Sequence, residues 1–245
     1  RALVRSRGLG DVYKRQIYKP GVLKAFKLGG HSAVNGASTD GGAGVKYVND
    51  NGFAFASNFV SKGSKTTAGI FTKEAKGKWD TQVAYTKPSY HVSLTYSDQQ
   101  NGWNSYSYYA TSDAATKAAT ADSTAYMLRA YWRPENAGTA TPEISAGYDV
   151  LDITGNGDNV KEADSYFVGL GWSDMFTADD KIGLAFGQPL KATKYGASGS
   201  SDVDPFLWEA YYAYKVNDAV TVQPAIFGGS DVRSDTEDDI FGVAL

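Results

Sequence analysis

Apolar and polar residues alternate along most of the chain, and this period of two is the feature that most constrains its fold. In residues 78–86, Trp79 and Tyr85 share one set of alternate positions, while Asp80 and Gln82 occupy the other. Such alternation is typical of β-strands whose two faces meet different surroundings. The chain is therefore predicted to be built from two-faced strands.

The same period recurs in further segments separated by turn-forming residues. A hairpin is predicted where the first of these strands ends at Lys87, Pro88 and Ser89, because proline presets the backbone bend. The strongest strand segments are 78–86, 90–97, 126–132, 143–150, 165–172, 181–186 and 206–215. Weaker candidates near 20–28, 43–48, 52–60, 220–227 and 239–245 bring the prediction to about twelve strands.

The composition favours an all-β fold and excludes several other classes. The 17 Tyr and 27 Gly argue against helix bundles and Leu-rich α/β enzymes. No apolar run approaches the ~18–20 residues of a transmembrane helix. The absence of cysteine excludes disulfide scaffolds, thiolate zinc sites and thiol catalysis. A net charge of −3 gives no reason to expect a nucleic-acid partner.

Two features favour an antiparallel transmembrane β-barrel over a soluble β-sandwich. Aromatic residues bracket aliphatic ones, as Tyr90 and Tyr96 bracket Val92 and Leu94, which matches the interfacial girdles of a membrane barrel. The predicted connections also alternate in length, as in barrels with short turns at one end and long loops at the other. The shorter ones are 49–51, 87–89, 133–141, 173–180 and 216–219, and the longer ones are 29–42, 61–77, 98–122, 152–163, 188–205 and 228–238.

The beginning of the chain differs from the rest. Residues 1–16 are basic, with Asp11 as their only acid, and their pattern does not continue further along the chain. The stretch from Asp11 to Gln16 can be back-translated as GAT GTG TAT AAG AGA CAG, which resembles the transposon end used to tag DNA for sequencing. We therefore hypothesise that 1–16 is a translated adapter, the alternative being a genuine basic linker. A native peptide that crosses Gln16 in mass spectrometry would exclude the adapter.

Part of the sequence resembles a known family. The segment 181–189, KIGLAFGQP, preceded by WSDMF at 172–176, is similar to the carbohydrate-selective bacterial porins, especially their cyanobacterial branch. Residues 209–226 resemble that family's penultimate hairpin, and 239–245 resemble the beginning of its last strand. The similarity is clearest over 164–245 and looser from 43 to 163.

The resemblance implies an outer-membrane protein of a Gram-negative-type, cyanobacterial cell. It implies a barrel of about sixteen or more strands, often in a homotrimer, and an amino-terminal domain that grips the cell wall. Barrels of this kind usually end on an aromatic residue, whereas this chain ends at Leu245 and begins at Arg1 rather than Met. We therefore expect residues 17–245 to be a carboxyl-terminal barrel portion, incomplete at both ends.

The polar positions of the strands are predicted to line a water-filled pore. Charges of both signs along a channel would order water and disfavour bulky apolar solutes. No nucleophile elbow, phosphate loop or zinc motif is present, so no catalytic residue, metal or cofactor is expected. The predicted pore-lining residues are Asp80, Gln82, His91, Arg129, Glu143, Asp149, Lys181, Glu209, Lys215 and Gln223.

Arg129 is the sharpest of these candidates, because it lies mid-strand where contact with lipid would be costly. One hypothesis places it at the pore constriction. The other makes it a structural ion pair with Glu143 or Asp80.

The long loop near 98–122 offers a second possible constriction, because it contains Trp103, Tyr106, Tyr108 and Tyr109. Folded inward, these rings would narrow the pore and stack on sugar faces. The alternative is a surface loop whose aromatic residues pack only against its own base.

The resulting expectation is a porin for passive diffusion of small hydrophilic solutes, carbohydrates or inorganic ions including iron, with no reaction and no cofactor. Outer-membrane lipid and small polar solutes are the expected partners. A soluble all-β carbohydrate-binding or glycosidase domain is the alternative from another class, and it would bury the aromatic face. A structural tether between wall and membrane is a third possibility, and it predicts no conductance.

Overall fold

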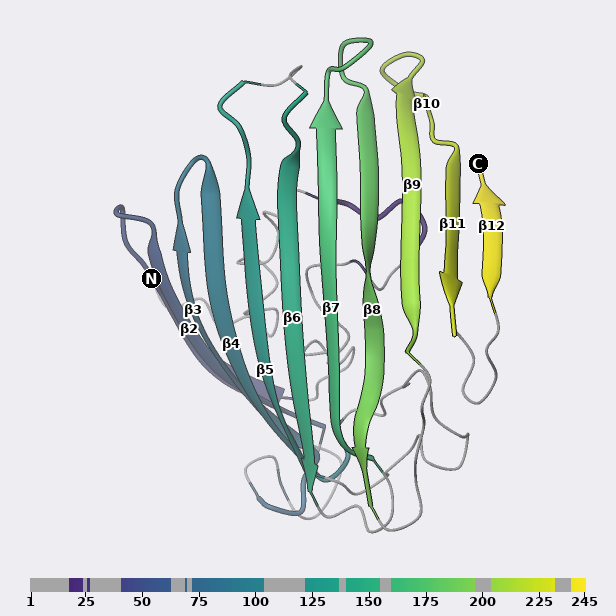
Figure 1. Cartoon of the computed structure of the whole chain (residues 1–245). Helices are drawn as coiled ribbons and strands as arrows, with labels where there is room; N and C mark the ends of the chain where they lie inside the picture. The colour runs from purple at the N-terminus through teal and green to yellow at the C-terminus, as the bar shows by residue number, and fades with distance from the viewer. Residues whose placement is uncertain are drawn as a thin grey trace.

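The structure is a computed structural model that describes residues 18–23, 26, 41–62, 69, 72–103, 122–136, 140–154, 160–196, 204–231 and 239–245. Its twelve strands form one antiparallel sheet (Figure 1). In chain order they are β1 (Gly41–Val48), β2 (Phe53–Ser61), β3 (Gly77–Thr86), β4 (Tyr90–Gln100), β5 (Asp122–Trp132), β6 (Glu143–Thr154), β7 (Val160–Ser173), β8 (Lys181–Tyr195), β9 (Phe206–Lys215), β10 (Thr221–Val222), β11 (Ala225–Ser230) and β12 (Ile240–Ala244).

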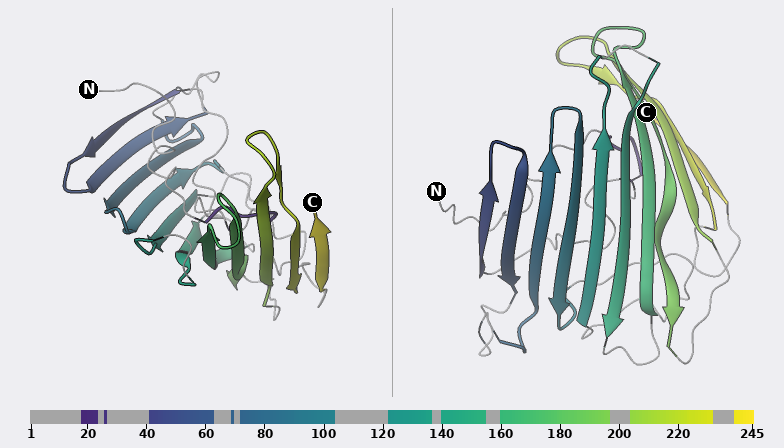
Figure 2. Two further views of the ribbon diagram at one scale, coloured as in Figure 1. Left: turned by 90° about the horizontal axis from the view of Figure 1, so that it is seen from above. Right: turned by 60° about the vertical axis from the view of Figure 1, so that its left-hand side comes forward.

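From β1 to β9 each strand pairs with the next one in sequence, and the meander continues from β9 to β11 and β12, with the short β10 attached to β9 alone. Seen from above, the strands follow an arc with a concave and a convex side (Figure 2). The prediction of an all-β antiparallel fold is confirmed. The sheet is not closed, since β1 and β12 do not pair with each other. The hypothesis about residues 1–16 lies outside the described residues.

The predicted strand at 20–28 is wrong, because none of its described residues belongs to the sheet. The amides of Gly21, Val22 and Leu23 donate to a carboxylate of β9 instead of to a neighbouring strand. The predicted strand at 220–227 is divided into β10 and β11, because Pro224 has no amide hydrogen for the ladder.

Successive connections lie at opposite ends of the sheet. We call the end with connections 49–52, 87–89, 133–142, 174–180 and 216–220 the turn end, and the opposite end the loop end. The predicted strict alternation of short and long connections is wrong at 152–163. There β6 continues to Thr154 and β7 begins at Val160, because alternate residues of this stretch pack into an apolar cluster.

The two faces of the sheet have opposite chemistry. In β4, Leu94 on the convex face is 52% exposed, whereas Thr95 on the concave face is 1% exposed. The register carries this alternation across the sheet, since Leu94 pairs with Val83 of β3 and Leu128 of β5. Large apolar side chains therefore cover the convex face. Polar side chains gather on the middle of the concave face from β3 to β6, and an apolar cluster with Phe167 and Leu207 lies there between β7 and β9.

The concave face becomes apolar towards the loop end, where β5, β6, β7 and β8 contribute buried side chains to one cluster. The sequence pattern did not separate this cluster from the polar residues further along the same strands. Its members are Ala125, Met127, Leu151, Ile153, Val160, Ala163, Leu190 and Ala192.

Among the described residues, no helix combines the length and the hydropathy needed to cross a membrane.

The turn between β7 and β8 is anchored by Asp180, which is fully buried. Its carboxylate accepts hydrogen bonds from the amides of Met175, Phe176 and Thr177 at 2.8–3.0 Å, and from the Tyr212 hydroxyl at 3.1 Å. Desolvation acts to raise the pKa of Asp180, but these hydrogen bonds outweigh it, so its pKa lies below the ordinary value.

A lowered pKa makes this turn sensitive to acid. Asp180 stabilises the fold above its unfolded pKa of about 3.9, and this contribution is lost as the pH falls through the lower folded value. Asp180→Asn should therefore lower the melting temperature in detergent at about pH 7, and the difference from the wild type should shrink towards about pH 2.5. Asp179→Asn is the matched control, because Asp179 forms an exposed ion pair with Lys215. Equal losses in both variants, or a difference independent of pH, would contradict this account.

Candidate functional site: the concave face

The middle of the concave face holds a concentration of buried polar side chains. Six of the ten residues predicted to line a pore lie there, on five strands from β3 to β9: Asp80, Gln82, His91, Arg129, Asp149 and Glu209. A row of smaller hydroxyl groups on β4, Ser93, Thr95 and Ser97, lies beside them.

Arg129 is held by an ion pair across two neighbouring strands. Its Nη2 lies 2.5 Å from Oδ1 of Asp149, and both side chains are at most 3% exposed. Its Nη1 donates to the carbonyl oxygens of Leu128 and Tyr148 at 2.7 and 3.3 Å. Arg129 therefore forms a buried ion pair, but the predicted partners, Glu143 and Asp80, are wrong. The register explains this, because Arg129 lies opposite Gly147 and so reaches Asp149 diagonally.

A second buried ion pair joins Lys78 and Asp80 on β3, with 3.0 Å between Nζ and Oδ2. Lys78 is absent from the residues predicted from the sequence, although alternation places it on the same face as Asp80 and Gln82. It was missed because it lies at the start of the predicted strand. In the structure β3 begins one residue earlier, at Gly77, so Lys78 is part of the paired face.

His91 is enclosed by hydroxyl groups and a ring. Its Nδ1 lies 2.7 Å from Oγ1 of Thr86, and its Nε2 lies 3.1 Å from Oγ of Ser93. The imidazole stacks on Tyr131 with a centroid distance of 5.2 Å and an interplanar angle of 13°. These contacts fix the imidazole ring against the concave face of the sheet.

Glu209 of β9 is fully buried and contacts a segment that precedes the first strand. Its Oε1 accepts the Tyr18 hydroxyl at 2.7 Å and the Gly21 amide at 2.8 Å. Its Oε2 accepts the amides of Val22 and Leu23 at 2.9 and 2.6 Å. We call residues 18–23 the strap. It lies on the concave side of the arc, where it is drawn in purple (Figure 2).

The remaining four predicted residues lie at the turn end rather than in the middle of the face. Lys215 pairs with Asp179 and Asp218 at 2.8 and 3.0 Å. Lys181 is exposed at the beginning of β8, and Gln223 is half-buried between β10 and β11. These residues are not brought together with the buried ion pairs.

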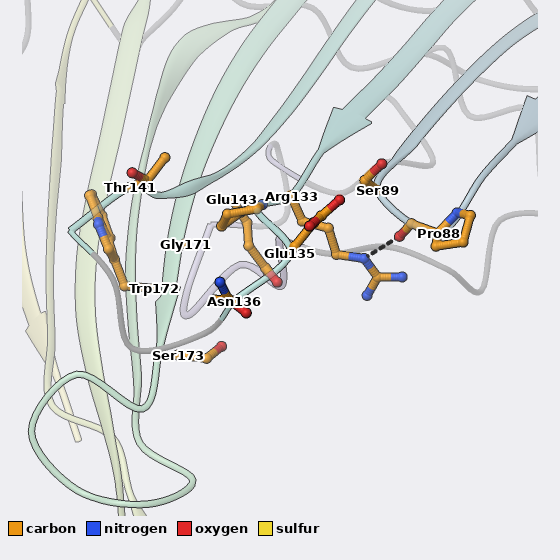
Figure 3. Close-up of a pocket in the computed structure, with 11 residues that line it drawn as sticks. Pro88, Ser89, Arg133, Glu135, Asn136, Thr141, Glu143, Gly171, Trp172 and Ser173 are labelled. Carbon is orange, nitrogen blue, oxygen red and sulfur yellow. Dashed lines mark hydrogen bonds between the residues drawn. The ribbon is translucent and has the colours of Figure 1, made fainter.

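Glu143 is the fourth, and it lines an open cavity of about 650 Å³ at the turn end (Figure 3). Arg133 fixes one wall of this cavity, because its Nε donates to the Pro88 carbonyl at 2.7 Å. The Trp172 indole fixes another by donating to the Ala140 carbonyl at 3.0 Å. The cavity combines one aromatic ring with acidic, basic and amide groups.

Of the aromatic residues predicted for the loop 98–122, only Trp103 belongs to the described residues. It is 3% exposed, and Nζ of Lys62 lies 4.3 Å from its ring centroid and donates to its carbonyl at 2.8 Å. Tyr106, Tyr108 and Tyr109 lie outside the described residues. Within the part of the chain that the structure describes, no three acidic or histidine side chains are grouped closely enough to hold a metal ion.

Comparison with models of protein families and with curated proteins finds no match to this chain.

The Arg129–Asp149 pair should couple strongly to stability. Arg129→Ala leaves the buried carboxylate of Asp149 without its cation, so we expect the free energy of unfolding to fall by about 3–5 kcal/mol. The double variant Arg129→Ala/Asp149→Ala should lose less than the sum of the two single variants, because it leaves no isolated charge. Unfolding by urea in detergent measures the free energy of unfolding of the two single variants and the double variant. Strict additivity would show that the pair contributes no coupling.

Proposed function

We propose that the chain forms the wall of an outer-membrane porin, through which small hydrophilic solutes diffuse passively. One observation carries this proposal: the sheet is inverted relative to a soluble protein, with charges buried on the concave side and large apolar residues exposed on the convex side. An apolar convex face of this extent needs an apolar surrounding, and lipid provides one.

The exposed aromatic residues support a membrane setting by their arrangement. Towards the loop end of β3, β4 and β5, Trp79, Tyr96 and Tyr126 are 37–51% exposed. Tyr148 and Tyr166, 45% and 41% exposed, pair with each other in the middle of β6 and β7. Nearer the turn end, Tyr90 and Trp132 are both 42% exposed and pair with each other across β4 and β5.

Aliphatic residues lie between these two aromatic rows, and their spacing suits a bilayer. Val92 and Leu94 separate Tyr90 from Tyr96 on β4. These six residues span about 20 Å along the strand and about 15 Å along the membrane normal at the ~40° tilt of barrel strands, and the aromatic rings at both borders extend this height towards the ~25 Å band of an outer-membrane barrel. The convex face therefore carries a band of suitable height with amphipathic rings at both borders.

The concave face supports passage of water and polar solutes. It presents cations and carboxylates in pairs, together with hydroxyl and amide groups, and its turn end opens into the cavity beside Glu143. Charges of both signs favour hydrated solutes over apolar ones without committing the pore to one ion. Carbohydrates and inorganic ions, iron included, are the proposed solutes.

The exposed aromatic face argues against the soluble carbohydrate-binding or glycosidase alternative. A soluble sandwich would bury this face against a second sheet, and none of the described strands packs on it. In the proposed barrel, the free edges of β1 and β12 pair with further strands. Membership of the carbohydrate-selective porins, a trimeric state and attachment to the cell wall are parts of the same proposal.

A charge on the convex face distinguishes lipid from water. Leu94→Arg places a cation mid-band, and it should cost about 2–4 kcal/mol in a membrane barrel but within about 0.5 kcal/mol on a soluble surface. Asp98→Arg is the matched control, because Asp98 is exposed on the same face of β4 beyond the aromatic row. We expect Leu94→Arg alone to lower the yield of folded protein in lipid vesicles. Equal folding of both variants would contradict the membrane setting.

The function itself is tested in planar bilayers. Purified protein should need detergent for extraction and should produce stepwise conductance in salt, with partial block by sugars if carbohydrates pass. Clean aqueous solubility, or membranes that stay silent while folded protein is inserted, would overturn the porin proposal and favour the soluble domain or the tether respectively.

A further inference from the structure

The carboxylate of Glu209 is fully buried, and its described hydrogen bonds all come from the strap rather than from its own strand or turn. All four hydrogen bonds to its carboxylate come from residues 18–23, at 2.6–2.9 Å. No ion pair to Glu209 is found among the described residues. The strap therefore supplies the compensation for this charge, and it does so largely through three consecutive backbone amides that form an anion-binding nest.

The concave face of the sheet has a recess into which the strap packs. A side chain at Gly169 would place its Cβ 2.6 Å from the Tyr18 ring, so the absence of one leaves the recess that this ring fills. Tyr18 also packs beside Tyr211, with centroids 6.1 Å apart, and its amide donates to Oγ of Ser145 at 3.3 Å. The strap thus bridges β6, β7 and β9 on the concave side.

Burial, followed by the hydrogen bond to Glu209, raises the pKa of the Tyr18 phenol, which keeps it a neutral donor. Tyr18, Phe26, Phe167, Ala185 and Leu207 form the apolar cluster that accompanies this polar contact. Polar and apolar contacts therefore hold the strap at one place against the wall.

We propose that Glu209 sets the width of the pore by holding the strap against the concave face of the sheet. We call this contact between Glu209 and the strap the latch. This inference rests on the proposed porin function and deepens it. When the latch holds, the strap occupies lumen that solutes would otherwise cross. When it is released, the lumen widens on the side of β6 to β9.

Glu209→Gln is the direct test of the latch. Its amide oxygen can accept from at most two of the four donors, and its NH₂ group faces the others as a second donor. The lost charged hydrogen bonds should lower the equilibrium constant for docking of the strap about tenfold or more. Single-channel conductance and the size limit for neutral sugars should both increase. Glu162→Gln is the matched control, since the Glu162 carboxylate forms an exposed ion pair with Lys194 of β8 and, among the described residues, no hydrogen bond to the strap.

A disulfide reports the docked strap without any need for conductance. The chain has no cysteine, and a Cβ built on Gly21 lies 3.2 Å from Cβ of Tyr211, close to the ~3.5–4.5 Å of a disulfide. The pair Gly21→Cys/Tyr211→Cys should oxidise readily in folded protein, whereas Gly21→Cys/Ser93→Cys should not, because β4 and β9 are five strands apart. Adding Glu209→Gln should slow the first reaction about tenfold.

The combined variant tests whether docking of the strap controls conductance. Glu209→Gln with the cysteine pair should conduct like the wild type when oxidised and more when reduced. Absence of the cross-link, or the same conductance in Glu209→Gln and Glu162→Gln, would overturn the latch. If no variant conducts, the porin proposal fails, while the cross-linking rate still decides whether Glu209 docks the strap. If Glu209→Gln fails to fold, Tyr18→Phe provides the same comparison with one donor removed.

Discussion

The burial of charge on the concave face is the constraint on which the rest of the structure depends. Arg129 with Asp149 and Lys78 with Asp80 are enclosed as ion pairs, and each would be costly if either partner were lost. Because side chains alternate along a strand, placing these groups inside forces their apolar neighbours outside. The exposed convex face is thus the necessary counterpart of the polar concave face, and the proposed lipid surrounding would remove the cost of exposing it.

The strap shows how a bulky ring and a buried carboxylate are accommodated on the same face of the sheet. The face between β6 and β9 carries glycines where rings must enter, and the Tyr18 ring packs over Gly169. Glu209 then gives the inserted backbone hydrogen-bond partners that a strand would otherwise provide. A segment without regular secondary structure is tolerated there because its amides are satisfied. Shape and charge together define one position for the strap on the concave face.

Much of the sheet was predictable because its signal is local. Alternation in residues 78–97 and at 126–132 reports which face each residue occupies, and the structure follows it. The strand at 20–28 was mispredicted because its short apolar pattern fits a strand equally well, and only the distant Glu209 shows where its amides bind. The partner of Arg129 depended on the register between β5 and β6, which the period of two does not specify. The apolar cluster around Leu151 and Val160 was hidden for a related reason: it follows the same alternation as the polar residues and differs only in position along the strand.

The inversion of the sheet is tested most directly by accessibility along one strand in a bilayer. Since the chain has no native cysteine, single cysteines at each position from Val92 to Ser97 can carry a nitroxide label in protein reconstituted into lipid vesicles. Labels at Val92, Leu94 and Tyr96 should collide more with oxygen, which partitions into lipid, than with a water-soluble nickel chelate. Labels at the intervening positions should not. Access of the nickel chelate to Val92, Leu94 and Tyr96, or no alternation at all, would contradict a convex face in lipid.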